Sequence, residues 1–144
     1  MSTLTPYDYR SALDSEAFTR VLDVFPTPQA GAGRISVKHV CEEFSHLCPF
    51  TGHPDYGTIE IGFRAGNRCV ELKSLKLYLQ QFRDLRIPYE AVVPAIFGHL
   101  AALMYPEESA RPDFEARGLL CVRGVWRGRG GIRSEVHQGD PALL

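Results

Sequence analysis

Residues 56–64, with the sequence YGTIEIGFR, carry a clean alternation of apolar and polar side chains. The apolar side chains of Ile59, Ile61 and Phe63 alternate with polar or small residues. This period of two is typical of a half-buried β-strand, because successive side chains point to opposite faces of a sheet. We therefore expect a strand with one face in the core.

Further strands are predicted on both sides of this stretch. Upstream, residues 34–40 alternate polar and apolar side chains and place Ile35 and Val37 inward. Downstream, turn residues at 65–67 precede an extended run at 69–72, which predicts a hairpin with residues 56–64. Two more extended runs lie near the end of the chain, at residues 119–126 and 132–136, joined by a basic turn at 127–131.

Two helices are predicted between the first two strands and the last two strands of the sequence. The first runs over residues 74–85 with Ser74 as its N-cap, and the second starts near Pro88. The second helix carries an apolar stripe of Val92, Val93, Ile96, Leu100, Leu103 and Met104. The order ββααββ predicts an α+β fold with a four-stranded antiparallel sheet and two helices on one face. Such a sheet has unpaired edges, so we expect a cyclic homo-oligomer.

Length and composition are those of one soluble domain. The chain has 144 residues, 44% of them hydrophobic, and a formal net charge of -1, so no global field favours nucleic acid or a membrane surface. Residues 1–20 are polar without a signal-peptide pattern and predict an N-terminal arm, followed by a catalytic domain at 21–144. The most apolar run, residues 91–105, is too short to span a bilayer. We expect a cytoplasmic protein with four free cysteines.

Cys48 is the strongest candidate nucleophile in the sequence. It precedes Pro49 in a loop where a thiol is more exposed than in a strand or helix, and Asp55 follows seven positions later as a candidate proton donor. A buried loop cysteine near a turn-forming aspartate explains the same spacing equally well. The residues alone therefore leave both interpretations open.

A zinc site is the competing interpretation of the same region. Five potential ligands are crowded there: His39, Cys41, His46, Cys48 and His53. Their spacings match no known zinc motif, so we expect no bound metal.

Two further groups of residues could bind a nucleotide-like ligand. Lys73 and Lys76 lie at a helix start with Ser74, where they could bind phosphate, although a solvated lysine face is the simpler explanation. Tyr89 and Glu90 could stack on a purine-like ring and accept its N–H groups, although a glutamate at a helix start often only complements the helix dipole.

Several motifs together resemble one enzyme family. The segments CPFTGHPD at 48–55, ELKSLKLY at 71–78, Tyr89-Glu90 and RGGI at 129–132 resemble the NADPH-dependent 7-cyano-7-deazaguanine reductases, often called QueF. The lysine-rich octapeptide is that family's signature. The resemblance implies a tunnelling fold (T-fold), in which subunits join their sheets into a barrel and form active sites between subunits.

The resemblance also implies a reaction and its residues. Two NADPH would reduce the nitrile of 7-cyano-7-deazaguanine to an amine in queuosine biosynthesis, a tRNA modification pathway, without direct binding of nucleic acid. Cys48 would form a covalent thioimide and Asp55 would supply the proton. Substrate would contact Val70, Glu71, Leu72, Tyr89 and Glu90, and NADPH would contact Lys73, Ser74, Lys76, Arg129 and Gly130.

The chain departs from the family pattern at two positions. Many members have His at the position of Tyr89 and Pro at that of Gly128.

Three alternative functions fit the motifs less well. A related amidinotransferase acts on the same nitrile, but its members lack the lysine signature. GTP cyclohydrolase I needs a zinc triad that this sequence does not assemble, and a non-catalytic purine- or pterin-binding protein would not need Cys48 with Asp55.

Overall fold

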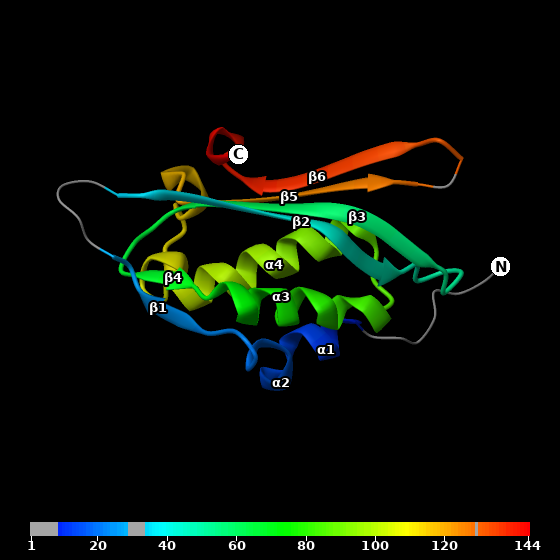
Figure 1. Ribbon diagram of the computed structural model, residues 1–144, viewed down its shortest axis with the longest axis horizontal. Helices are drawn as coiled ribbons and strands as arrows, with labels where there is room; N and C mark the ends of the chain where they lie inside the picture. Colours follow the sequence, from blue (N-terminus) through cyan, green and yellow to red (C-terminus); the bar gives the residue numbers. More distant parts are fainter. Residues whose placement is uncertain (1–8, 29–33, 129) are drawn as a thin grey trace.

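Four antiparallel strands form the main sheet of the protein, in the order β2-β3-β5-β6. They are β2 (Ser36–Leu47), β3 (Pro54–Arg64), β5 (Leu120–Arg127) and β6 (Arg133–Gly139). The computed structural model describes residues 9–28, 34–128 and 130–144. Figure 1 shows the sheet as one layer with the helices on the opposite side from the C-terminus, which confirms the predicted α+β class.

The alternation in β3 has the predicted effect, and its neighbour β2 is longer than predicted. Ile59, Ile61 and Phe63 are each at most 1% exposed to solvent. β2 continues to Leu47 through a register shift between Cys41 and Phe44. The inward orientation predicted for Ile35 is wrong: this residue precedes β2, its carbonyl accepts a hydrogen bond from Ala65 N, and its side chain is 48% exposed.

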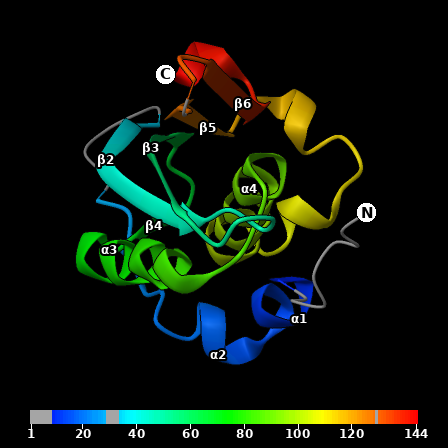
Figure 2. The same cartoon turned by 90° about the vertical axis from the view of Figure 1, so that its right-hand side faces the viewer.

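The helices α3 (Leu72–Gln80) and α4 (Tyr89–Met104) cover one face of the sheet, with the 3-10 helix η1 (Gln81–Asp84) between them (Figures 1 and 2). α3 begins earlier than predicted, and its N-cap is Glu71 rather than Ser74. The Glu71 carboxylate accepts hydrogen bonds from the amides of Lys73 and Ser74, both at 2.8 Å. Ser74 is inside the first turn, where its hydroxyl donates to the Glu71 carbonyl at 2.8 Å.

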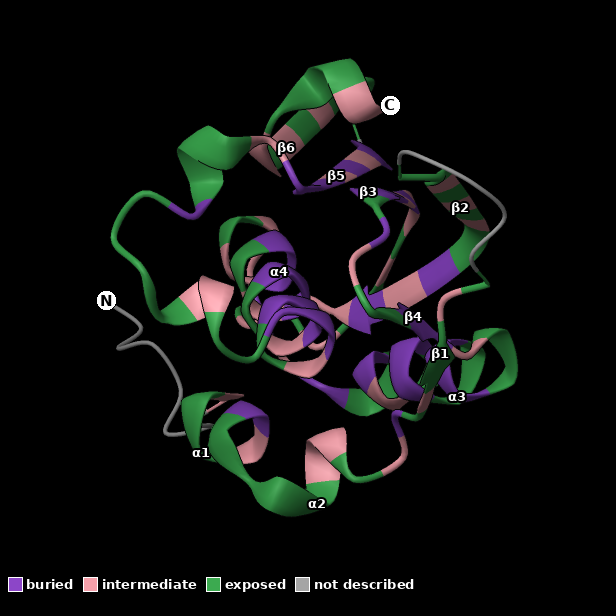
Figure 3. Cartoon of the chain, turned by 90° about the vertical axis from the view of Figure 1, so that its left-hand side faces the viewer, coloured by how far each residue is buried: buried purple, intermediate pink, exposed green. Residues whose placement is uncertain are grey.

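The predicted apolar stripe of α4 forms the centre of the core. Val92, Val93, Ile96 and Leu100 are completely buried. The helix is continuous through Pro94, which lies on its exposed side. Figure 3 shows the buried residues of α3 and α4 gathered against β2, β3 and β5, whereas β6 has no buried residue.

The predicted hairpin between β3 and the following extended run is wrong. Residues Arg68–Val70 form a short strand, β4, which pairs antiparallel with β1 (Val24–Pro26) in a separate sheet. Both edges of β3 are already occupied by β2 and β5, so no edge is left for β4. The segment therefore crosses to the helical layer and leads into α3.

The described part of the predicted N-terminal arm forms two short helices, α1 (Tyr9–Asp14) and α2 (Glu16–Thr19). Leu13 of α1 is buried, and the Phe18 ring of α2 packs edge-on against Tyr78 and Phe82. The division into an arm and a domain stays a prediction. Short 3-10 helices complete the chain: η2 (Glu108–Ala110), η3 (Glu115–Arg117) and η4 (Pro141–Leu143). None of the helices in the described ranges is long and apolar enough to cross a bilayer.

His99 links this N-terminal segment to the core. The Tyr78 hydroxyl lies 2.6 Å from His99 Nδ1, and His99 Nε2 lies 2.9 Å from the carbonyl oxygen of Leu13. Because a carbonyl only accepts, Nε2 carries the proton and Nδ1 accepts from the Tyr78 hydroxyl. Burial lowers the pKa of His99 from its ordinary value, so the neutral imidazole is favoured.

We predict that the protein loses stability as the pH falls below the ordinary histidine pKa of 6.5. Burial lowers the pKa values of His39, His46 and His99 in the folded chain. At a pH between these lowered pKa values and the ordinary one, the unfolded chain therefore binds more protons than the folded chain. The contribution of these neutral histidines to stability is therefore complete above pH 6.5. It is lost as the pH falls from 6.5 toward the pKa values of the histidines in the folded chain. Urea denaturation about one unit above and below this value measures the effect.

His99→Gln and the exposed His137→Gln form a matched pair for this experiment. His99→Gln removes one of the three histidines whose pKa burial lowers and should make the free energy of unfolding less dependent on pH, whereas His137→Gln controls for the loss of an imidazole at an exposed position. Equal pH dependence in the two variants would contradict the role of His99.

Candidate active site

Cys48 follows the last residue of β2 and opens the turn that leads into β3. Two backbone hydrogen bonds close this turn: Cys48 N donates to His53 O at 2.8 Å, and Gly52 N donates to Cys48 O at 2.9 Å. Gly52 has a φ of 72°, in the left-handed region that favours glycine. The thiol is therefore half-buried at the rigid end of a hairpin.

The turn also adjusts the acidity of the thiol. Burial alone would raise the pKa of Cys48, but hydrogen bonds from the Thr51 hydroxyl and from the backbone of Thr51 and Phe50 bring it below its ordinary value, against the negative charge of Asp55. In contrast, burial raises the pKa values of Cys41 and Cys121. Since the thiolate is the nucleophile, Cys48 is the most favoured of these three to react.

A pocket of about 400 Å³ brings together the predicted pair Cys48 and Asp55 with Tyr89 and Glu90. Four elements meet there: the end of β2, the start of β3, the start of α4 and the β5–β6 turn. The remaining lining residues are Pro49, Phe50, Pro88, Gly128, Ile132 and Ser134. A thiol, two carboxylates and an aromatic ring therefore face one cavity large enough for a small ligand.

Tyr89 is fixed in place by two buried aromatic side chains. Its ring stacks on Trp126 with centroids 4.6 Å apart and planes 14° apart, and it meets the edge of His46 at 5.6 Å. Trp126 and His46 are both fully buried. A Cβ at Gly128 would lie at an ordinary contact distance of 3.8 Å from the Tyr89 hydroxyl oxygen, whereas the carbonyl oxygen of Ile132 would be closer, at 3.1 Å. This packing gives the pocket a rigid aromatic wall on which a flat ring could bind.

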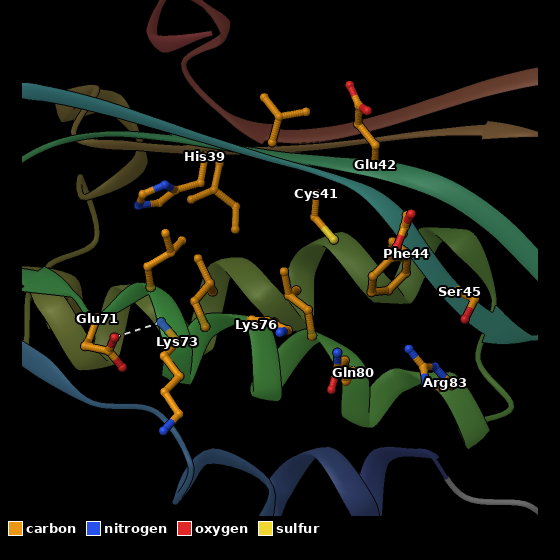
Figure 4. Close-up of a pocket in the computed structure, with 16 residues that line it drawn as sticks. His39, Cys41, Glu42, Phe44, Ser45, Glu71, Lys73, Lys76, Gln80 and Arg83 are labelled. Atoms are coloured by element: carbon orange, nitrogen blue, oxygen red, sulfur yellow. Dashed lines mark hydrogen bonds between the residues drawn. The ribbon is translucent and has the colours of Figure 1, made fainter.

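A second pocket, of about 860 Å³, lies between β2 and α3 (Figure 4). Its lining includes Glu71, Leu72, Lys73 and Lys76 from the predicted site. The Glu71 carboxylate is bonded to the amides of Lys73 and Ser74, which lowers its pKa. The amides of Lys73 and Ser74 at this helix N-terminus are thus already capped, and the positive charges of the pocket are the side chains of Lys73, Lys76 and Arg83, set against the carboxylates of Glu42, Glu43 and Glu71.

The other predicted binding residues lie outside these two pockets. Val70 is 2% exposed and Ser74 5% exposed, and neither lines a cavity described above. Gly130 is exposed with a φ of 85°. Arg129 lies outside the described residues. Among the residues that the structure places, the cysteine group and the lysine group therefore occupy separate pockets of one chain.

Some lining residues were missed by the sequence analysis. Arg83 and Gln80 line the second pocket with Lys73 and Lys76. Their spacing of three, four and three residues along α3 and η1 is a helical signal that could have identified them. In contrast, Ile132 and Ser134 lie in the predicted extended run at 132–136, but their place in the first pocket depends on how the paired strands β5 and β6 lie against the start of α4.

The crowded His and Cys residues do not assemble into a metal centre in the described ranges, where no group of three or more His, Cys, Asp or Glu could hold an ion. His46 points into the core against Phe44, Tyr89 and Trp126. His39 instead lines the second pocket, away from Cys48.

Fold and site together define an α+β protein with a hydrogen-bonded cysteine in an aromatic-walled pocket. Residues 54–140 match the family described as QueF-like protein, and the chain belongs to the QueF family. A relative from Rhodopirellula baltica, named NADPH-dependent 7-cyano-7-deazaguanine reductase, is 38% identical over 85% of this chain and 92% of its own length. A relative of the same name from Anaeromyxobacter dehalogenans is 43% identical over 74% and 82%.

A solved structure shows the same likeness at the level of the fold alone. The crystal structure of the archaeosine synthase QueF-Like in the apo form superposes with a TM-score of 0.53 and 10% sequence identity. The match covers 77% of this chain and 98% of that chain.

We predict that Thr51→Val slows the alkylation of Cys48 by iodoacetamide at neutral pH. Losing the hydroxyl hydrogen bond should raise the pKa of the thiol and reduce the thiolate fraction, for a rate loss of about three- to tenfold. Mass spectrometry of the modified peptide measures the rate. Thr58→Val on β3, away from the turn, is the control, and equal rates in the two variants would contradict the proposed activation.

Proposed function

We propose that this chain is an NADPH-dependent reductase that converts the nitrile of 7-cyano-7-deazaguanine into the amine of 7-aminomethyl-7-deazaguanine, in the cytoplasmic pathway to queuosine in tRNA. The names of its relatives support this activity. The observation that carries it is the pocket in which Cys48, with its lowered pKa, faces Asp55 and Glu90. Substrate capture needs these three groups within reach of one small molecule.

In the first step Cys48 attacks the nitrile carbon. The carbon–sulfur bond forms as one C–N π bond breaks, and Asp55 gives the nitrogen a proton. The product is a thioimide attached to Cys48. Its carbon is more electrophilic than that of a nitrile, so covalent capture prepares the substrate for reduction.

Two reductions follow at this carbon, and NADPH supplies a hydride in each. After the first, nitrogen is protonated and Cys48 leaves as a thiol, which generates an imine. The second hydride and another proton complete the amine. In total, the reaction consumes one nitrile, two NADPH and two protons, and it produces one amine and two NADP⁺. Asp55 must therefore deliver protons more than once per turnover.

Glu90 and Tyr89 are suited to positioning the substrate next to Cys48. Glu90 is exposed in the first turn of α4, where its carboxylate can accept two N–H groups from the deazaguanine edge. Tyr89, fixed by its stacking on Trp126, offers the aromatic surface.

The second pocket supplies the positive charge for the NADPH phosphates. Lys73 and Lys76 are exposed on α3 and line this pocket together with Arg83. Because Glu71 caps the amides, phosphate contacts come from side chains rather than from the helix N-terminus. The buried Ser74 would support this turn, and the predicted roles of Arg129 and Gly130 stay predictions.

Association of subunits would bring the two pockets together. β2 and β6 are the outer strands of the described sheet. Residues of β2 line the second pocket, and Ile132 and Ser134 at the start of β6 line the first. Pairing β6 of one subunit with β2 of the next would therefore form a barrel and a joint site, in which Val70, Glu71 and Leu72 approach the substrate from the partner side.

We predict that the wild-type protein oxidises NADPH in the presence of 7-cyano-7-deazaguanine and that Cys48→Ala abolishes this turnover. The alanine variant lacks the sulfur that forms the thioimide. Absorbance of NADPH follows the reaction, and the buried Cys69→Ala, measured per folded protein, should remain active. A folded wild type that consumes no NADPH would refute the proposed activity.

We predict that Lys73→Ala combined with Lys76→Ala raises the KM for NADPH about tenfold or more, because two phosphate-binding charges are lost. The KM for the nitrile should stay within about twofold. Lys38→Ala, which removes a lysine bonded to Glu60 and to the Leu144 carbonyl, is the matched control. An unchanged KM for NADPH in the double variant would remove these lysines from the cofactor site.

Co-assembly of Cys48→Ala subunits with the double lysine variant tests the joint site directly. A site that draws Cys48 from one variant and the lysines from the other is complete, so roughly a quarter of the sites in a random mixture should be restored. The assay uses NADPH well below the KM of the lysine variant. Activity no higher than the sum of the separate variants would show that each site lies within one subunit.

A further inference from the structure

Two large apolar side chains that line the Cys48 pocket are mostly exposed to solvent. Phe50 is 65% exposed and Ile132 is 68% exposed, and among the exposed large apolar residues of the described ranges these two line this pocket. Single exposed apolar residues are ordinary, but a pair gathered at one pocket is typical of a ligand-binding surface. Both side chains therefore indicate a contact that forms when a ligand binds.

The two side chains come from different turns, each held by backbone hydrogen bonds. Phe50 lies in the turn that starts at Cys48 and is closed by two such bonds. Ile132 lies in the β5–β6 turn, where its carbonyl accepts a hydrogen bond from Gly128 N at 2.7 Å. The pocket therefore has an apolar side chain on each of two turns, together with the aromatic wall that Tyr89 provides from α4.

Phe50 is also linked to the reacting sulfur. Its backbone is hydrogen-bonded to the Cys48 thiol and helps to lower the pKa of that thiol. Because this bond fixes residue 50 beside the sulfur, a group attached to Cys48 would lie close to residue 50. The thiol is only half-buried in the free protein. Solvent would therefore reach a carbon bound to this sulfur unless an apolar group covered it.

Water is a competing reactant for the thioimide of the proposed reaction. The electrophilic carbon accepts a hydride from NADPH, but water can attack it as well, and a closed site prevents such hydrolysis. Attack by water forms a carbon–oxygen bond, and departure of Cys48 as a thiol then leaves a carboxamide. Departure of ammonia instead leaves a thioester, which a second water hydrolyses to a carboxylic acid and the free thiol. Neither route involves oxidation or reduction, so neither consumes NADPH.

We propose that Phe50 and Ile132 are specificity-determining residues: they clamp the flat ring of the bound substrate and keep water from the thioimide, so that hydride attacks its carbon. Both side chains lose their exposure when the ring binds, and this burial contributes to substrate affinity. The side on which the cofactor binds is left as the open approach to the carbon. The inference rests on the proposed function, because water and hydride compete only if Cys48 forms the thioimide.

Phe50→Ala tests this proposal through the identity of the product. The variant should fold, because truncation of an exposed side chain costs little stability. With NADPH in water labelled with heavy oxygen, mass spectrometry of the small molecules should detect labelled carboxamide or carboxylic acid beside the amine. The hydrated fraction should exceed that of the wild type about tenfold or more, and the KM for the nitrile should rise about tenfold. The hydrated fraction should fall as NADPH is raised, because both nucleophiles compete for one thioimide.

Ile132→Ala should shift the products in the same direction, and two further variants are controls. Phe50→Leu keeps an apolar cover and should restore most of the amine product. Phe25 is also exposed, at 42%, but it lies on β1 and lines neither of the two pockets, so Phe25→Ala should form the amine as the wild type does.

Amine alone from either alanine variant of the clamp, at the wild-type KM, would overturn the role of that residue. A Phe50→Ala protein that differs from the wild type only by a smaller oligomeric mass would also overturn the proposal, because the ring would then pack against a second subunit.

A second measurement does not depend on turnover. Isothermal titration calorimetry with 7-deazaguanine, which has the flat ring but no nitrile, should give a Kd about tenfold higher for Phe50→Ala than for the wild type. Equal Kd values would overturn the clamp even if both proteins were inactive. A wild type that binds the ring more tightly than Phe50→Ala but consumes no NADPH would support the clamp and refute the proposed function.

Discussion

The antiparallel pairing of β2 with β3 is the constraint on which the rest of the site depends. Ten Cα pairs run from Ser36↔Arg64 to Leu47↔Pro54, interrupted by one register shift between Cys41 and Phe44. This register places Cys48 at the end of one strand and Asp55 at the start of the next, on either side of a turn closed by two backbone hydrogen bonds. A slip of one residue would turn Asp55 to the opposite face of the sheet, away from the pocket that it lines with Cys48.

The helical layer completes the site from the other side. α4 presents Tyr89 and Glu90 at its first turn, and its buried stripe holds that turn against the sheet. α3 uses Glu71 to cap its own amides, so its positive character is carried by Lys73 and Lys76. The same sheet and helices thus line two different pockets, one with the Cys48 thiol and one with charged residues of both signs from β2 and α3. Edge-to-edge association of subunits is the arrangement that would use both.

The sequence predicted the parts of this structure that depend on local patterns. The alternation around Ile59 identified β3, and the stripe from Val92 to Met104 identified the core side of α4. It did not predict that β4 pairs with β1, because that pairing depends on which edges of β3 are free. Nor did it predict the Glu71 cap, since Ser74 three residues later belongs to the preferred N-cap residue types and glutamate does not.

The candidate site divides in the same way. Cys48, Asp55, Tyr89 and Glu90 were expected to act together from motifs, and the structure places them around one pocket. His46 was considered from the sequence only as a potential zinc ligand, because its burial and its position opposite Asp55 arise only from strand pairing. The roles proposed for Val70, Glu71 and Leu72 would require a neighbouring subunit, which no pattern within one chain specifies.

The central claim is that Cys48 captures the nitrile covalently, and intact-protein mass spectrometry tests it most directly. Incubated with 7-cyano-7-deazaguanine without NADPH, the wild type should gain the mass of one substrate per chain at the Cys48 peptide, and the adduct should disappear when NADPH is added. An adduct that forms equally in Cys48→Ala, or none in a wild type that turns over, would contradict the thioimide mechanism.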